Sequence, residues 1–65
     1  MNAKELEKIL FSDGWAVKNQ KGSHRQYIHP TKKGKVTIPF HGKQDIHLSV
    51  VKSILKQAGI NIEGR

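Results

Sequence analysis

A short segment from Lys21 to Tyr27 holds the residue types that chemistry on RNA would need. His24 follows the dipeptide Gly22-Ser23 and lies among basic residues at the start of an expected strand. RNA carries its own nucleophile, the 2′-hydroxyl, so cutting it requires a group that moves a proton and cations that neutralise phosphate. Histidine has an unperturbed pKa of about 6.5, which suits a general acid or base at neutral pH. The segment predicts an RNA-cutting site with His24 as its catalytic residue, and a solvated or structural histidine is the alternative interpretation.

The length of the chain limits the kind of site that it can build. Its 65 residues are enough for one domain, and a chain of this size buries only about 60% of the surface that it exposes when unfolded. The core is therefore thin and leaves no room for a deep pocket. We expect the chemistry to take place on an open surface, where a large substrate binds to one face of the protein.

The charge of the chain favours an acidic partner. Twelve Lys and Arg residues against five Asp and Glu residues give a formal net charge of +7. The basic residues are spread along the chain and not gathered in a tail, which is typical of a folded basic face. Nucleic acid is the expected partner, although an acidic protein would satisfy the same field.

The chain contains no cysteine, so neither a disulfide nor a thiolate metal site is expected. The N-terminus lacks the apolar run of a signal peptide, and no segment approaches the roughly 20 apolar residues of a membrane span. We therefore expect a cytoplasmic protein that has no membrane partner.

The spacing of apolar residues predicts two helices around three strands. Asn2 and Glu5 have the spacing of a capping box at the start of the first helix, which Gly14 ends. The strands are expected over residues 15–18, 24–29 and 35–39, with a polar loop over 19–23. Residues 48–58 form the second helix before Gly59, and its apolar stripe consists of Leu48, Val51, Ile54, Leu55 and Ala58. Residues 1–60 are expected to be a single domain, and residues 61–65 a disordered tail.

This order of elements predicts an α+β fold, a two-layer sandwich in which two helices cover one face of a three-stranded antiparallel sheet. Alternation along the strands then assigns each side chain to a face. The side chains expected to point toward the helices are Trp15, Val17, Tyr27, Val36 and Ile38. Those expected on the open face are Lys18, His24, Gln26, Lys35 and Thr37. Ile28 fits its open-face position poorly, and Arg25 and His29 would have to lie at the rim of the helix side.

The other histidines and the large aromatic residues have structural interpretations. His29 precedes Pro30 and is expected at a strand end, and His47 lies where it could cap the second helix. A metal site is not expected, because no Cys joins the histidines and no helical His pair at i, i+4 exists. Trp15 and Tyr27 could stack on bases, but we expect them in the core, which has few other aromatics. His41 follows Phe40 near the end of the third strand.

Several motifs together resemble the HicA family of toxins from the first helix to Gly59. They are Asp13-Gly14-Trp15, Lys21-Gly22-Ser23-His24-Arg25-Gln26-Tyr27 with His29-Pro30, Val36-Thr37-Ile38-Pro39, and Ser53-Ile54-Leu55-Lys56-Gln57-Ala58-Gly59. The resemblance implies a bacterial messenger-RNA interferase of a toxin–antitoxin pair, with a fold like a double-stranded-RNA-binding domain and one essential histidine, His24. It also implies a HicB-type antitoxin that covers the active face.

The expected mechanism needs no metal or other cofactor. His24 acts as general base toward the 2′-hydroxyl or as general acid toward the leaving 5′-oxygen. The second proton transfer could involve water, Lys18, Lys35 or Gln26, and the sequence does not choose among them. The residues expected to bind RNA are Lys18, Lys21, Gly22, Ser23, Arg25, Gln26 and Lys35.

A non-catalytic double-stranded-RNA-binding module is the second hypothesis, and a generic protein-interaction domain is the third. Such RNA-binding modules usually place a cluster of lysines at the start of the last helix. Here that region reads Asp45-Ile46-His47-Leu48-Ser49, which departs from the pattern and favours the ribonuclease.

Overall fold

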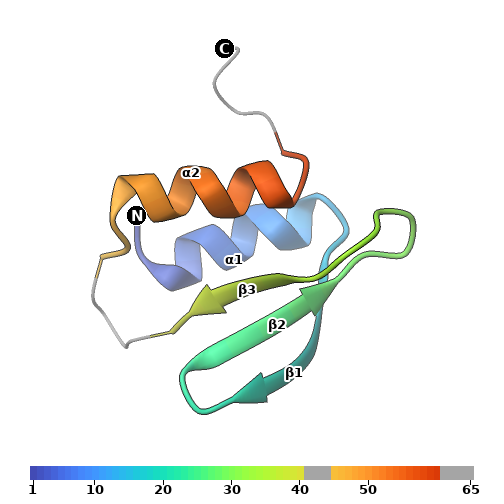
Figure 1. The fold of residues 1–65 in the computed structure, drawn as a ribbon, viewed down its shortest axis with the longest axis horizontal. Helices are drawn as coiled ribbons and strands as arrows, with labels where there is room; N and C mark the ends of the chain where they lie inside the picture. The colour runs from blue at the N-terminus through green and yellow to red at the C-terminus, as the bar shows by residue number, and fades with distance from the viewer. Residues whose placement is uncertain (41–44, 61–65) are drawn as a thin grey trace.

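The computed structural model describes residues 1–40 and 45–60. Its elements follow the expected order of helix, three strands and helix (Figure 1). They are α1 (Ala3–Ser12), β1 (Ala16–Lys21), β2 (His24–Ile28), β3 (Val36–Pro39) and α2 (Leu48–Gln57). The expectations for His41 and for a disordered tail over residues 61–65 lie outside the described residues.

Both helices begin and end as the sequence predicts. The capping box is present, because Asn2 Oδ1 accepts from the backbone N–H of Glu5 and Glu5 Oε1 accepts from that of Asn2, each at 2.9 Å. Gly14 and Gly59 follow the two helix C-termini with φ of 104° and 68°, a conformation that L side chains rarely adopt. At Gly14 a Cβ would also lie 2.8 Å from Nε2 of His29, so glycine is required there for space as well.

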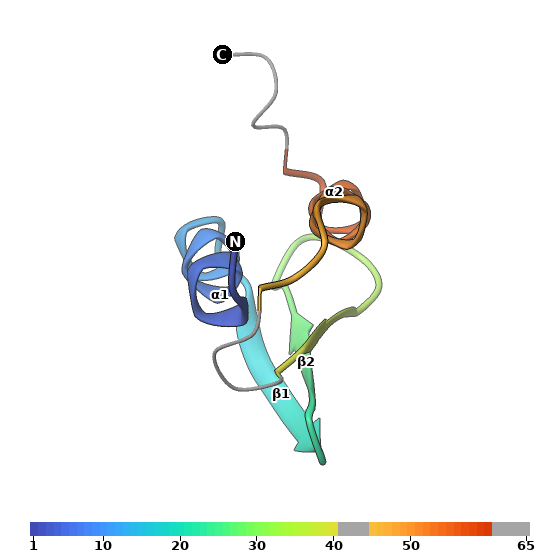
Figure 2. The ribbon, with the colours of Figure 1, turned by 90° about the vertical axis from the view of Figure 1, so that its left-hand side faces the viewer.

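The strands form one antiparallel sheet in the order β1-β2-β3. Both helices lie on the same side of this sheet, which leaves its other face open (Figure 2). The predicted two-layer α+β fold is therefore confirmed. The interior between the layers is a single cluster of buried residues, Ala3, Leu6, Leu10, Trp15, Tyr27, Val36, Ile38, Val51, Ile54, Leu55 and Ala58.

The first strand is longer than the sequence predicts. Residues 19–21, expected in a loop, continue β1, and the register shifts between Val17 and Asn19. Lys18 is the extra residue of this β-bulge, and a bulge resets the alternation of side chains between the two faces. From Asn19 onward, β1 therefore presents Asn19 and Lys21 to the open face, where their partners Gln26 and His24 lie.

Two apolar residues expected in the core are exposed. Val17 pairs with the buried Tyr27 and so lies on the helix side of the sheet, yet it is 44% exposed. Both helices pack against β3, and β1 lies at the opposite edge of the sheet. Leu48 is 64% exposed. It is the first residue of α2, and helical side chains point toward the N-terminus, so its side chain extends beyond the packed turns.

A polar cluster joins the ends of both helices to the β2–β3 connection. Lys32 Nζ donates to Asp13 Oδ2 at 2.5 Å and to the carbonyl oxygen of Ala58 at 2.9 Å. Trp15 Nε1 also donates to Asp13 Oδ2, at 3.2 Å. Because Asp13 is the C-cap of α1 and Ala58 that of α2, one lysine holds three segments together.

The substitution Lys32→Met should destabilise this junction. The carbonyl of Ala58 would lose its ammonium donor, which lowers the free energy of unfolding by about 1 kcal/mol. For a domain of this size, that loss lowers the melting temperature by roughly 4–8 °C. Thermal melting followed by circular dichroism measures the shift. Lys33→Met is the matched control, because Lys33 is exposed, and an equal loss in both variants would contradict the assignment.

Acid should weaken the same junction. The hydrogen bond from Lys32 holds the pKa of Asp13 below its usual value of 3.8, so the pairing stabilises the fold above that pH and is lost as the pH falls through the lower, folded-state pKa. We expect Asp13→Asn to cost more stability at about pH 6 than at about pH 2.5. Urea unfolding of both proteins at the two pH values tests this, and a pH-independent difference would contradict it.

Candidate functional site

A tight turn places His24 at one end of the β1–β2 hairpin. Lys21 and His24 are cross-strand partners, so only Gly22 and Ser23 form the turn. Gly22 is the first of the two turn residues and has a φ of 56°. Two-residue hairpin turns need a positive φ at this position, which glycine adopts readily. Gln20 Nε2 donates to the carbonyl of Gly22 at 3.0 Å, which fixes the turn from the opposite face.

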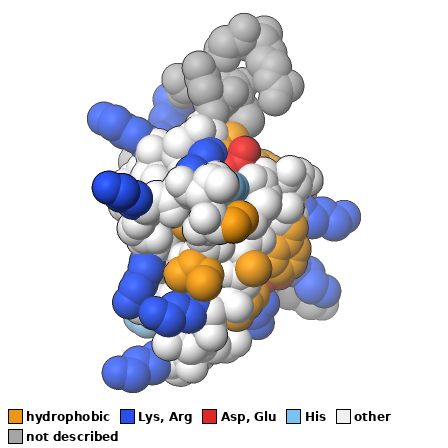
Figure 3. Space-filling model, turned by 90° about the vertical axis from the view of Figure 1, so that its right-hand side faces the viewer, with side chains coloured by type: hydrophobic (Ala, Val, Ile, Leu, Met, Phe, Trp, Pro, Cys, Tyr) orange, Lys and Arg blue, Asp and Glu red, His pale blue; other side chains and the backbone are white. Residues whose placement is uncertain are grey.

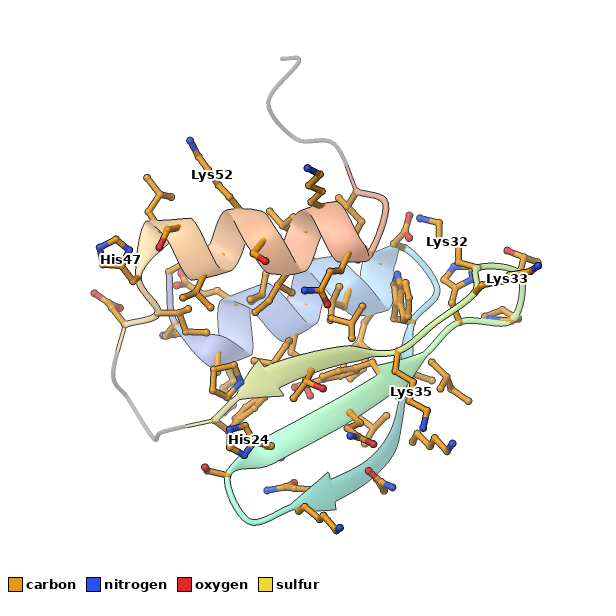
Figure 4. The ribbon with its side chains drawn as sticks, in the orientation of Figure 1. His24, Lys32, Lys33, Lys35, His47 and Lys52 are labelled. Carbon is orange, nitrogen blue, oxygen red and sulfur yellow. The ribbon has the colours of Figure 1, made fainter. Side chains whose placement is uncertain are left out.

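The end of β3 fastens this turn to the rest of the sheet. The backbone N–H of Phe40 donates to the carbonyl of Ser23 at 2.5 Å, and Pro39 is the cross-strand partner of His24. The histidine therefore stands on the middle strand, with a partner residue on each side. Its side chain lies at the end of the sheet where β3 finishes (Figure 4).

The open face of the sheet consists of cross-strand rows, because paired residues of antiparallel strands point to the same face. Successive rows on one face are two residues, or about 6.6 Å, apart along the strands. The first row is Lys21, His24 and Pro39, the second is Asn19, Gln26 and Thr37, and the third is Ala16 with Ile28.

The register places the expected cations at different distances from His24. Lys21 is its direct cross-strand neighbour. Lys35 is four residues before Pro39, which corresponds to about 13 Å along an extended chain, and Figure 4 shows it at the other end of the sheet. Lys18 lies at the bulge, three residues before Lys21. The structure thus brings together His24 and Lys21, with Gly22 and Ser23 between them, but not Lys35 or Lys18.

Arg25 points toward the helices, as its sequence position predicts. Its Nη1 donates to Glu7 Oε2 at 2.7 Å, its Nε to Gln20 Oε1 at 3.0 Å, and its guanidinium carbon lies 4.1 Å from the centre of the Phe40 ring. The hydrogen bond to Glu7 raises the pKa of Arg25. The guanidinium thus binds the carboxylate of Glu7 on the helix side of the sheet. The expected contact of Arg25 with phosphate on the open face remains a prediction.

Tyr27 is fully buried beside the same carboxylate. Its hydroxyl donates to Glu7 Oε2 at 2.6 Å, and burial, followed by that hydrogen bond, raises the pKa of Tyr27. The core assignment of Tyr27 is confirmed, and so is that of Trp15, which is 2% exposed. Glu7 was not predicted from the sequence as part of the site. An arginine that points toward the helices needs an acidic partner there, and α1 contains only two acidic residues, so this signal could have identified Glu7.

The sequence was compared with models of known protein families, and one of them matches almost the whole chain. The family model for the HicA toxin of bacterial toxin-antitoxin systems matches residues 3–60, which include both helices and all three strands. The chain belongs to the HicA toxin family. A comparison with curated proteins finds no match. The role of this HicA-family protein is that of a toxin, and its family implies an antitoxin as partner.

Two other histidines of this HicA-family protein have structural roles, as expected. His29 Nδ1 accepts from the backbone N–H groups of Thr31 and Lys32, at 3.1 and 3.2 Å, which leaves Nε2 to donate to the carbonyl of Asp13 at 2.7 Å. His47 is the N-cap of α2, and its Nδ1 accepts from the backbone N–H of Ser49 at 3.1 Å.

Among the residues that the structure describes, no three His, Cys, Asp or Glu side chains are grouped closely enough to hold a metal ion. Within the same residues, neither helix is long and apolar enough to cross a membrane.

Basic side chains are prominent on the side of the HicA-family protein that Figure 3 shows. Figure 3 shows Lys and Arg side chains around the rim of one side of the molecule and hydrophobic side chains nearer its middle. Lys52 projects from α2 away from the sheet (Figure 4). Basic side chains therefore lie outside the open sheet face as well as on it, and the specific geometry of the site comes from the sheet.

Proposed function

We propose that this toxin is an endoribonuclease, a messenger-RNA interferase that cuts single-stranded RNA and thereby arrests translation and growth. One observation carries the proposal: a HicA-family chain presents His24 on an open sheet face, directly opposite a lysine in a glycine-turned hairpin. A histidine supplies proton transfer near neutral pH, and a neighbouring ammonium group stabilises negative charge on phosphate.

The proposed reaction uses the nucleophile that RNA provides. The 2′-oxygen attacks phosphorus and loses its proton, the bond from phosphorus to the 5′-oxygen breaks, and that oxygen gains a proton. His24 carries one of these transfers and water the other. The products are a 2′,3′-cyclic phosphate and a 5′-hydroxyl, and no oxidant, reductant or metal is required.

The substrate contacts follow from the register. Lys21 is the proposed phosphate ligand at the cut, because it is the cross-strand neighbour of His24. Lys18 and Lys35 would bind phosphates further along the face. Gly22 and Ser23 would line the approach to His24, and Gln26 lies in the next row. A direct proton transfer by Lys35 is disfavoured by its separation of about 13 Å from the histidine row.

We further propose that the antitoxin is of the HicB type and covers the open face. A protein with a formal net charge of +7 attracts an acidic partner and associates with it rapidly. Co-expression tests the pairing. Growth arrest by the toxin should be relieved by the product of the neighbouring gene, and continued arrest would count against it.

The decisive experiment for the enzymatic proposal compares two RNAs in excess chelator. One is a single-stranded RNA, and the other has a single 2′-deoxynucleotide on the 5′ side of a mapped cut site. The wild-type protein should cut the first RNA and lose that one cut in the second. A cut that survives the deoxy substitution would contradict attack by the 2′-hydroxyl, and binding of both RNAs without cutting would favour the RNA-binding module.

A further inference from the structure

The second row of the open face differs in chemistry from the rows on either side. The first row is basic, with Lys21 and His24, and the paired residues of the third row, Ala16 and Ile28, are apolar. The second row contains only amide and hydroxyl side chains, those of Asn19, Gln26 and Thr37. Each of these groups can both donate and accept a hydrogen bond.

The three side chains are positioned together by two independent pairings. Asn19 pairs with Gln26 across β1 and β2, and Gln26 pairs with Thr37 across β2 and β3. The row therefore crosses the whole sheet and spans about 10 Å, two inter-strand spacings. The bulge at Lys18 creates this arrangement, because without it Asn19 would point to the helix side.

These side chains remain available to a ligand. Asn19 is exposed, and Gln26 and Thr37 are half-buried. In the part of the chain that the structure describes, none of the three side chains takes part in a hydrogen bond. Gln20, on the opposite face, shows the contrast, since its amide binds both Gly22 and Arg25.

We propose that the row of Asn19, Gln26 and Thr37 reads the base of the nucleotide next to the cut and so makes cleavage depend on sequence. This inference rests on the proposed ribonuclease activity. The row lies about 6.6 Å from the row of His24, so an RNA strand with its scissile phosphate at His24 brings an adjacent base over it. Amide and hydroxyl groups recognise the hydrogen-bonding edges of unpaired bases, as sequence-specific readers of single-stranded RNA do.

The neighbouring apolar row limits where that base can lie. Ile28 is 41% exposed on the open face, beside Ala16. Its side chain offers a base ring an apolar surface but no hydrogen-bonding partner, so amide and hydroxyl contacts to a base come from the second row. Alternation along β2 places Ile28 on the open face, and a strand of RNA that lies across this face gives its apolar side chain a surface to contact.

The test is cleavage of a pool of random single-stranded RNA, followed by sequencing of the cut ends. Wild type should show a preferred base at one position beside the cut. Gln26→Leu, Asn19→Ala and Thr37→Val, tested separately, should lose at least about 5-fold of that preference among the cuts that they make, the lower end of what one specific contact discriminates. Gln57→Ala is the matched control, an exposed amide on α2, and should keep the wild-type preference.

The outcomes separate this inference from the proposed function. Cutting by wild type without any base preference overturns the inference alone, as does an unchanged preference in all three row variants. Folded row variants that no longer cut at all would place the row in the proton-transfer machinery and also overturn base reading. Absence of cutting by the wild type would contradict the ribonuclease itself, and the inference with it.

Discussion

The substitution His24→Ala should abolish most RNA cleavage while leaving the domain folded. A general acid or base contributes about 100-fold to 10,000-fold to a rate, so the initial rate on single-stranded messenger RNA should fall by that factor. The fold should survive because His24 is exposed at the end of β2, and the core contains none of its atoms.

A second histidine provides the control for this experiment. His47 is also exposed, and it caps α2. His47→Asn removes an imidazole while keeping a good N-cap residue, so it should cut RNA at the wild-type rate. Both variants are compared with wild type in low salt and excess chelator, after thermal melting has established cooperative unfolding. Wild-type cleavage by folded His24→Ala would eliminate the proposed mechanism.

The largest effect on stability is expected for Trp15→Ala. Trp15 is 2% exposed, and its ring packs edge-on against that of His29 with centroids 5.2 Å apart. Removing a buried aromatic side chain costs about 3–5 kcal/mol. A domain of this length has roughly 3–10 kcal/mol in total, by the usual stability per residue. We therefore expect Trp15→Ala to lose about half or more of this stability and to melt well below the wild-type protein.

Two comparison variants make this prediction specific. Trp15→Phe retains an aromatic ring and loses the hydrogen bond from Nε1 to Asp13, so it should fold with a smaller loss. Phe11→Ala alters an aromatic residue that is 48% exposed and should also cost less. Thermal melting orders the three proteins. If Trp15→Ala melted like wild type and only RNA binding fell, Trp15 would be a base-stacking residue and not part of the core.

Local signals in the sequence were sufficient for the helices and for most of the sheet. The capping box at Asn2 and the glycines after each helix act within a few residues, so their geometry can be read from spacing alone. The periods of 2 residues in strands and 3.6 residues in helices likewise identify the buried faces. The exposure of Leu48 escaped this reasoning, because periodicity gives the direction of a side chain and not whether anything lies opposite it.

The bulge at Lys18 was missed for a related reason. No residue type marks a bulge in this strand, and it is detected only when β1 is paired with β2. The consequence for the site is large. The bulge brings Asn19 and Lys21 to the open face and interrupts the simple alternation by which Lys18 was assigned to the same face as His24.

The family, the order of elements and the position of His24 after a glycine turn could all be predicted from short motifs and from the spacing of residues close together in the chain. The contacts of the site could not. That Lys21 is the neighbour of His24, that Arg25 binds Glu7 and that one polar row crosses three strands became clear once the strands were paired and the layers packed. Strand register and contacts between layers join distant residues, and local spacing carries no information about which distant residues meet.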